Sequence, residues 1–173
     1  MLTHLDLSYT RVQDGALVAA GKHAPLLEAV TINGSRLGSF TDAGVHALVD
    51  GCPHVTQLTL CPAGGITNAS LAAVAQRWPR LQHLDLYASA VTDEGIVAVA
   101  HGCGELKLLS IGSTAVTSAS VIAIARHCHL LTQLDVSYTD GATDASVAAI
   151  AIGCPSLRRL DMRYAGEITD TGM

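Results

Sequence analysis

Cysteine and histidine residues lie next to one another at two places in the sequence, in an arrangement that could bind a metal ion. His101 precedes Cys103 by two residues, and Cys128 stands between His127 and His129. Imidazole and thiolate groups are preferred ligands of zinc, which requires four of them to converge. The two clusters recur 25 residues apart, however, and a periodic position predicts structural thiols that point into a core while the histidines point elsewhere. We therefore expect buried, free cysteines, with neither a metal nor a cofactor.

Two histidines stand two residues before an aspartate, and such a pair could take part in acid–base catalysis. The pairs are His4 with Asp6 and His83 with Asp85. Residues two apart on a strand point the same way without forming the water-excluding pocket that catalysis requires. The sequence also lacks a glycine-rich phosphate loop, a nucleophile elbow and a metal-binding helix motif. We therefore expect that the chain is not an enzyme.

An internal repeat determines the elements that must position these side chains. The motif Leu-x-x-Leu-x-Leu, with conservative replacements, recurs at steps of 25 to 28 residues, and its first positions are Leu2, Leu27, Val55, Leu81, Leu106, Leu131 and Leu157. Self-similarity at such a period is the signature of a solenoid. We interpret residues 1–173 as one domain of about seven repeats, the last of them truncated.

Each repeat has the pattern of a strand, a turn and a short helix. The motif ends in an apolar–polar alternation, as in Leu84-Asp85-Leu86, which fits a strand with one buried face. Apolar residues then recur at helical spacing, as at Ile96, Val99 and Ala100. Residues of N-cap type precede these helices in one column, and we predict that they cap them: Asp14, Asp42, Asn68, Asp93, Ser118, Asp144 and Asp170.

The repeats must stack, because one repeat alone buries too few side chains to offset the entropy of ordering it. Strands in a parallel sheet lie about 4.8 Å apart, whereas packed helices need about 8–10 Å. The stack therefore has to curve. We predict an α/β solenoid in the form of a curved arc, with a parallel β-sheet on the concave face and short helices on the convex face.

A column of cysteines adds a family resemblance. Cys52, Cys103, Cys128 and Cys154 each precede the first position of a repeat by three residues. Together with the leucine motif and the Val/Ile-Thr-Asp that follows it, this pattern resembles the cysteine-containing subfamily of leucine-rich repeat proteins, best known from F-box proteins. The resemblance implies a leucine-rich repeat solenoid and the substrate-binding arc of a ubiquitin ligase, although no F-box segment is visible. Cys61 falls outside this column, near the concave rim, and we expect an accessible thiol there.

Composition restricts the class of partner. The chain carries 10 Lys and Arg against 15 Asp and Glu, a formal net charge of -5, and it has no polybasic tract. Phosphate-rich partners require clustered Lys and Arg, so we expect protein partners, and neither nucleic acid nor membrane. The first residues lack the basic and apolar regions of a signal peptide, which indicates a cytoplasmic or nuclear protein.

The exposed strand positions and one edge of the concave sheet form the candidate binding surface. The column between the second and third leucine is polar with an acidic bias, for which a solvated strand face is the simpler explanation. All four tyrosines lie in the two columns that follow the strands; tyrosine is enriched in binding hot spots, but packing over the turn explains it equally well. The predicted protein-binding residues are Tyr9, His83, Asp85, Tyr87, Asp135, Tyr138, Arg159, Asp161, Arg163 and Tyr164.

Two functions fit these observations. The first is a protein–protein interaction module that uses the concave surface, with a substrate receptor or adaptor of an F-box-type ubiquitin ligase as its specific form. The alternative is a structural scaffold of a cytoskeletal or multiprotein assembly that self-associates through the solenoid ends. Neither end has a polar capping unit, so we expect a fragment of a longer protein or end-to-end association. The long turn at residues 33–40 is interpreted either as a contact loop or as a neutral bulge.

Overall fold

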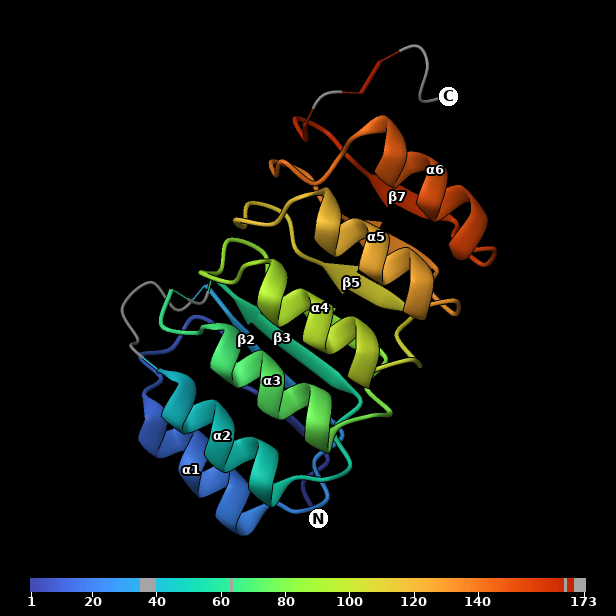
Figure 1. Cartoon of the computed structure of the whole chain (residues 1–173). Helices are drawn as coiled ribbons and strands as arrows, with labels where there is room; N and C mark the ends of the chain where they lie inside the picture. Colours follow the sequence, from blue (N-terminus) through green and yellow to red (C-terminus); the bar gives the residue numbers. More distant parts are fainter. Residues whose placement is uncertain (35–39, 63, 167, 170–173) are drawn as a thin grey trace.

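Strands and helices alternate along the chain and stack into a single curved solenoid (Figure 1). The computed structural model describes residues 1–34, 40–62, 64–166 and 168–169. Within these ranges, seven strands form one parallel sheet in sequence order: β1 (His4–Asp6), β2 (Ala29–Asn33), β3 (Gln57–Cys61), β4 (His83–Asp85), β5 (Leu108–Ser110), β6 (Gln133–Asp135) and β7 (Arg159–Asp161). The helices between them are α1 (Asp14–His23), α2 (Asp42–Gly51), α3 (Asn68–Arg77), α4 (Asp93–Gly102), α5 (Ser118–His127) and α6 (Asp144–Gly153).

The strands pair in register, so each column of the repeat becomes a row across the sheet. Leu58 of β3 pairs with Leu84 of β4, which pairs in turn with Leu109 of β5. These leucines are at most 1% exposed and belong to one continuous core between the sheet and the helices. Because successive strand residues point to opposite faces, the adjacent polar positions, such as Asp85 beside Ser110, lie on the other face of the sheet.

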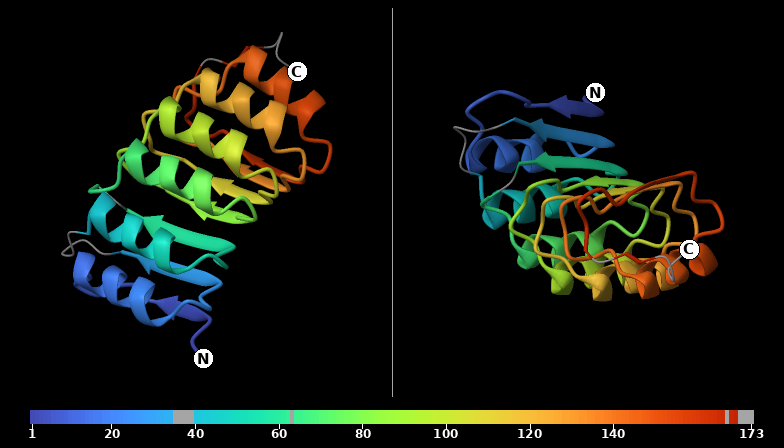
Figure 2. Two further views of the ribbon diagram at one scale, coloured as in Figure 1. Left: turned by 60° about the horizontal axis from the view of Figure 1, so that its bottom comes forward. Right: turned by 90° about the horizontal axis from the view of Figure 1, so that it is seen from above.

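The arc has the predicted curvature, with the sheet on its concave face and the helices on its convex face (Figure 2). Paired strands approach more closely than packed helices, so the helical side of every repeat is wider than the strand side. The predicted α/β solenoid is therefore confirmed in its sheet order, its layers and its curvature.

The helices begin one residue earlier than predicted. Thr41, Thr67 and Thr117 are the N-caps of α2, α3 and α5, and each side chain accepts a hydrogen bond from the backbone N–H two residues later. The predicted cap column holds the first residue of each helix instead, so its assignment as the N-cap is wrong by one position. Asp170, the last member of that column, lies outside the described residues.

This column links consecutive repeats. The two carboxylate oxygens of Asp42 accept hydrogen bonds from the backbone N–H and the hydroxyl of Thr67, at 2.9 and 2.7 Å. An equivalent pair of bonds joins three further pairs of residues: Asp14 to Thr41, Asp93 to Thr117 and Asp144 to Thr169. Asp14, Asp42 and Asp93 therefore each fix the threonine that precedes the helix of the next repeat.

The aspartate–threonine link is replaced by a different set of hydrogen bonds between α5 and α6. Ser118 occupies the aspartate column there, and the described part of the chain shows no hydrogen bond from it to Thr143. Thr143 and Ser146 instead form a capping box, in which the backbone N–H of Thr143 donates to Ser146 Oγ at 2.8 Å. The start of α6 is thus fixed from within its own repeat.

Glycine at the last position of a helix allows close helix–helix contact. A Cβ atom on Gly51 of α2 would lie 1.9 Å from the backbone oxygen of Gly21 in α1. A Cβ atom on Gly102 of α4 would lie 2.3 Å from the backbone oxygen of Ala75 in α3, and Gly153 of α6 approaches α5 in the same way. Because α3 and α5 end in residues with side chains, this contact occurs at every second helix.

The cysteine column is buried, as predicted. Its four thiols are free and at most 4% exposed, and each cysteine is the C-cap of a helix: Cys52, Cys103, Cys128 and Cys154. The Cys103 thiol donates to the backbone oxygen of Trp78, which fills the same place one repeat earlier, at 3.5 Å. Burial raises the pKa of the Cys103 and Cys128 thiols to about 12, so both groups are neutral structural thiols.

Cys61 is less accessible than predicted. It is the last residue of β3 and is half-buried. Burial, and then the negative charge of Asp85, raises the pKa of this thiol to about 11. The expectation of an accessible thiol is therefore corrected to a sheltered group that stays protonated at neutral pH.

The long turn before α2 ends in a residue of the core. Phe40, at the end of the long turn, is buried in the core at the place that Val91 fills two repeats later, whereas residues 35–39 of this turn lie outside the described residues. No described helix is both long and apolar enough to cross a membrane. Among the described residues, no three His, Cys, Asp or Glu side chains gather where they could hold a metal ion.

Candidate functional site

Side chains from four neighbouring strands surround a hollow on the concave face. The hollow has a volume of about 210 Å³ and lies over β4 to β7. Asp85, Asp135 and Asp161 line it, together with Leu108 and Arg159. The parallel register accounts for this grouping, because it places the aspartate column in one row across these strands. Four of the predicted binding residues are thus brought together.

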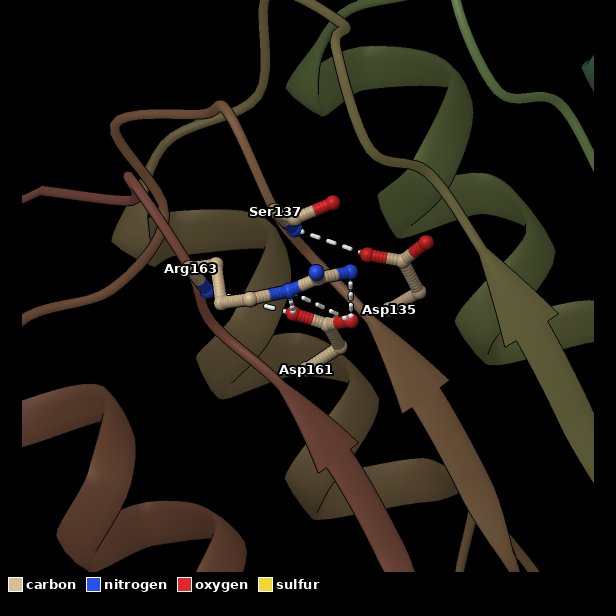
Figure 3. Close-up of polar contacts among 4 residues, drawn as sticks. All are labelled: Asp135, Ser137, Asp161 and Arg163. Atoms are coloured by element: carbon tan, nitrogen blue, oxygen red, sulfur yellow. Dashed lines mark hydrogen bonds and ion pairs between the residues drawn. The ribbon is translucent and has the colours of Figure 1, made fainter.

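The aspartates of this row also have a local structural role. Asp135 Oδ1 accepts a hydrogen bond from the backbone N–H of Ser137 at 2.9 Å (Figure 3). Asp85 accepts the equivalent bond from Tyr87 at 3.1 Å, and the aspartate of β7 repeats the arrangement. An aspartate that bonds the amide two residues later favours a turn over a longer strand. The acidic bias of the column therefore has a cause that is independent of any partner.

Arg163 lies beside the hollow and binds the carboxylate of Asp161 (Figure 3). Its Nε donates to Oδ1 at 2.9 Å and its terminal nitrogen donates to Oδ2 at 2.7 Å. Hydrogen bonding within the pair lowers the pKa of Asp161 and raises the pKa of Arg163. The Arg163 side chain is 71% exposed, so the pair orients the guanidinium group on the surface and contributes little to stability.

Tyr138 and Tyr164 stack on each other at the edge of the concave sheet. Their ring centroids are 4.8 Å apart and the rings are 19° from parallel. Both residues remain exposed, at 51% and 78%. Their backbones have φ values of 57° and 54°, in the left-handed region that non-glycine residues rarely adopt. The structure thus brings together the two tyrosines that share a column in consecutive repeats.

The other two tyrosines lie apart from this pair and against glycines. A Cβ atom on Gly34 would be 2.5 Å from the ring of Tyr9, and a Cβ atom on Gly112 would be 2.9 Å from the ring of Tyr87. Each ring therefore covers the backbone of the following repeat. This arrangement agrees with the packing interpretation for Tyr87, which is half-buried, while Tyr9 remains 82% exposed.

His83 of β4 and Leu108 of β5 lie opposite each other in the sheet. His83 is half-buried outside the hollow, and burial, followed by the positive charge of Lys107, lowers its pKa. Leu108, which pairs with His83, was not among the predicted binding residues but lines the hollow. Its signal in the sequence is a large apolar side chain in a column that is otherwise mostly polar.

Comparisons with known proteins agree with this architecture. A family described as Leucine Rich repeat matches residues 1–19 and 153–173. No curated protein sequence matches the chain significantly. The sequence match thus lies in the first repeat and around the last one, and the repeats between them are identified by their structure.

Solved structures resemble the whole arc. An internalin from Listeria monocytogenes superposes with a TM-score of 0.71 at 20% identity, over 98% of this chain and 44% of the internalin chain. A chain in the crystal structure of the yeast Rad7–Elc1 complex superposes with a TM-score of 0.82 at 20% identity, over 94% of this chain and 42% of that chain. The chain thus spans less than half the length of either. These likenesses show the fold, which is a leucine-rich repeat solenoid.

Proposed function

We propose that this leucine-rich repeat chain is a protein-interaction module that holds its partner on the C-terminal half of the concave face. The observation that carries the proposal is the exposed Tyr138–Tyr164 stack. Two stacked rings present a large apolar area with two hydroxyl groups at low entropic cost, which is typical of binding hot spots. Such a pair at the protein surface favours recognition over packing.

The stack and the hollow over β4 to β7 form one surface, because the chain connects them directly. Asp135, which lines the hollow, is followed three residues later by Tyr138, and Asp161 is followed three residues later by Tyr164. Arg163 lies between the two features and binds Asp161. A partner that covers the rings therefore also meets these charged side chains.

The hollow gives this surface its selectivity. Its lining combines three carboxylates with Arg159 and the apolar side chain of Leu108. A volume of about 210 Å³ offers room for about one large side chain. We infer that the partner inserts one polar or amphipathic side chain into the hollow and packs neighbouring residues against Tyr138 and Tyr164.

A substrate receptor or adaptor of a ubiquitin ligase, acting in the cytoplasm or nucleus, is the specific form of this function that we propose. Its support is the similarity of the fold to a chain of the Rad7–Elc1 complex, together with the cysteine column of the repeats. Mass spectrometry of complexes captured with the tagged chain tests this role. Recovery of ubiquitin-ligase subunits is expected, and their consistent absence from complexes that contain the partner contradicts the role.

The concave site is tested by capture from cell extract with the unchanged chain and with a variant that combines Tyr138→Ala and Tyr164→Ala. Alanine is compatible with the fold at these left-handed positions, since Ala88 occupies the same column with a φ of 57°. Tyr9→Ala is the matched control, because Tyr9 shares the column and the conformation but lies in the first repeat. Loss of partners in the double variant alone is expected. Equal recovery by all three proteins, with unchanged circular dichroism, rules out the tyrosine site.

A further inference from the structure

A second surface combines apolar and basic side chains on the edge where the helices end and the strands begin. Two hollows adjoin there at Pro155, which lines both of them. One, of about 470 Å³, lies between α5 and α6, and the other, of about 480 Å³, lies beside the segments that lead into β5, β6 and β7. We call this the Pro155 surface and define it by six further lining residues: Lys107, Arg126, His129, Leu130, Ile152 and Arg158.

Ile152 is apolar at a place where the repeat is otherwise polar. It is the next-to-last residue of α6, and its side chain is 84% exposed. The same place in the other described helices is also exposed and holds Lys22, Asp50, Gln76, His101 and Arg126. Because this place is exposed in all the described helices, the exposure of Ile152 follows from the repeat geometry and not from the position of α6 in the stack. Packing therefore does not require an isoleucine here.

Leu130 extends the apolar character into the second hollow. It is 50% exposed and lines that hollow beside Pro155. Single exposed apolar residues are ordinary on protein surfaces, but apolar residues grouped around hollows mark binding sites. Ile152, Pro155 and Leu130 form such a group, because the two hollows adjoin at the proline.

The rim of this surface is basic. Lys107, Arg126 and Arg158 line the two hollows with His129, and no carboxylate is among the described lining residues. The whole edge where the helices end and the strands begin has more basic than acidic residues, although the net charge of the chain is -5. Among the described residues, the edge holds six Lys and Arg against three Asp and Glu: Lys22, Arg77, Arg80, Lys107, Arg126 and Arg158, against Glu28, Asp50 and Glu105.

The helix dipole accounts for only part of this charge. Arg126 lies in the last turn of α5, where a cation offsets the exposed carbonyl groups. Lys107 and Arg158, in contrast, directly precede β5 and β7, so no helix end explains them. The two strand-side cations point instead to a negatively charged partner.

We propose that the Pro155 surface is a docking site for an acidic peptide segment of a protein partner. The segment inserts apolar side chains beside Ile152 and Leu130 and places Asp or Glu side chains near Lys107, Arg126 and Arg158. Complementary charge supports this occupant, since the rim is cationic and the described lining holds no carboxylate. The site lies outside the concave face and is independent of the function proposed above.

Selection from a library of random 16-residue peptides displayed on phage, with the whole chain as bait, tests the docking site. Peptides in which Leu, Ile or Phe is flanked by Asp and Glu are expected. Fluorescence anisotropy of a selected peptide then measures its Kd for the unchanged chain and for variants. Ile152→Gln is expected to weaken binding about tenfold, and Arg158→Glu is expected to weaken it further and to reduce its dependence on salt.

Two controls separate this site from other surfaces. Arg80→Glu removes a cation from the same edge but outside the Pro155 surface, and it is expected to leave the Kd within about twofold of the unchanged value. The Tyr138→Ala, Tyr164→Ala variant is expected to bind the peptide normally, and loss of binding there would assign the peptide to the concave face and overturn the docking site. Enrichment of basic or uncharged peptides, binding that is insensitive to Ile152→Gln and Arg158→Glu, or failure to enrich any sequence also overturns it. Glutamine already occupies the equivalent place at Gln76, so Ile152→Gln is compatible with the fold.

Discussion

Asp93 and Thr117 lie in consecutive repeats and are joined by two hydrogen bonds. The backbone N–H of Thr117 donates to Asp93 Oδ1 at 2.8 Å, and its hydroxyl donates to Oδ2 at 2.7 Å. Because Thr117 is also the N-cap of α5, Asp93 fixes the residue from which the next helix starts. Polar contacts of this kind, in addition to the leucine core, therefore hold one repeat to the next.

Replacement of Asp93 by alanine is expected to lower the free energy of unfolding by about 2 kcal/mol, because charge-assisted hydrogen bonds to the next repeat are lost. Asp93→Asn is expected to cost less than half as much, since Asn68 bonds the backbone N–H and hydroxyl oxygen of Thr92 at 3.0 and 2.8 Å in the same place. Urea denaturation measures both effects. Equal stability of the alanine variant and the unchanged chain would show that the link is dispensable.

The same aspartate is expected to make stability depend on pH. Partial burial by itself would raise the pKa of Asp93, but hydrogen bonds from Ser120 and Thr117 outweigh it and lower the pKa below 3.8. A carboxyl group whose pKa is lower in the folded state than in the unfolded state stabilises the fold at any pH above the unfolded-state pKa. This stabilisation is lost as the pH falls through the folded-state pKa. The difference in unfolding free energy between the unchanged chain and Asp93→Asn should therefore shrink from pH 6 to pH 3. A difference that stays constant contradicts this assignment.

Close helix contact predicts a large effect of one added methyl group. Gly102→Ala places a Cβ atom 2.3 Å from the backbone oxygen of Ala75, so α4 has to move away from α3. We expect a loss of about 2 kcal/mol or more in the free energy of unfolding. Gly104→Ala is the matched control, because its Cβ atom meets no atom closer than 4.0 Å. Similar thermal midpoints for the two variants would refute the tight contact.

The left-handed column predicts a stabilising substitution. Ala88 has a φ of 57°, which costs an L-residue about 1–2 kcal/mol, whereas glycine adopts this conformation freely, as Gly34 does in the same column. The greater flexibility of glycine in the unfolded chain offsets about 0.4–1 kcal/mol of that gain. Ala88→Gly should therefore stabilise the chain by about 0.5–1 kcal/mol, and Ala88→Val should destabilise it. The denaturant midpoints of the two variants and of the unchanged chain test this prediction. A glycine variant that is less stable than the unchanged chain counts against strain at Ala88.

Cys61 is expected to react slowly with thiol reagents at neutral pH. Its pKa of about 11 leaves only a small thiolate fraction at pH 7, and that fraction rises about tenfold with each pH unit. The rate of modification by a disulfide reagent should therefore climb without a plateau between pH 7 and pH 9.5. Cys61→Ser serves as the control for the four buried cysteines, and a plateau near pH 8.5 would indicate an ordinary, exposed thiol.

Much of the fold could be predicted because the same pattern of apolar and polar residues recurs in each repeat. Leu58, Leu84 and Leu109 follow from the motif, and the burial of Cys103 follows from its fixed distance to the next leucine. The cap assignment failed because aspartate and threonine are both good N-caps, and the sequence does not say which of two neighbours starts the helix. The choice depends on the next repeat, whose threonine needs the aspartate as an acceptor.

The sequence by itself determined the solenoid, its curvature and the columns that face the concave side, because these depend on the period and on apolar spacing alone. Tertiary structure alone decided which side chains of neighbouring repeats contact one another. It stacked Tyr138 on Tyr164, bound Asp93 to Thr117 and joined two hollows at Pro155. The physical reason is that side chains some 25 residues apart in sequence meet only when parallel strands and packed helices bring their repeats side by side.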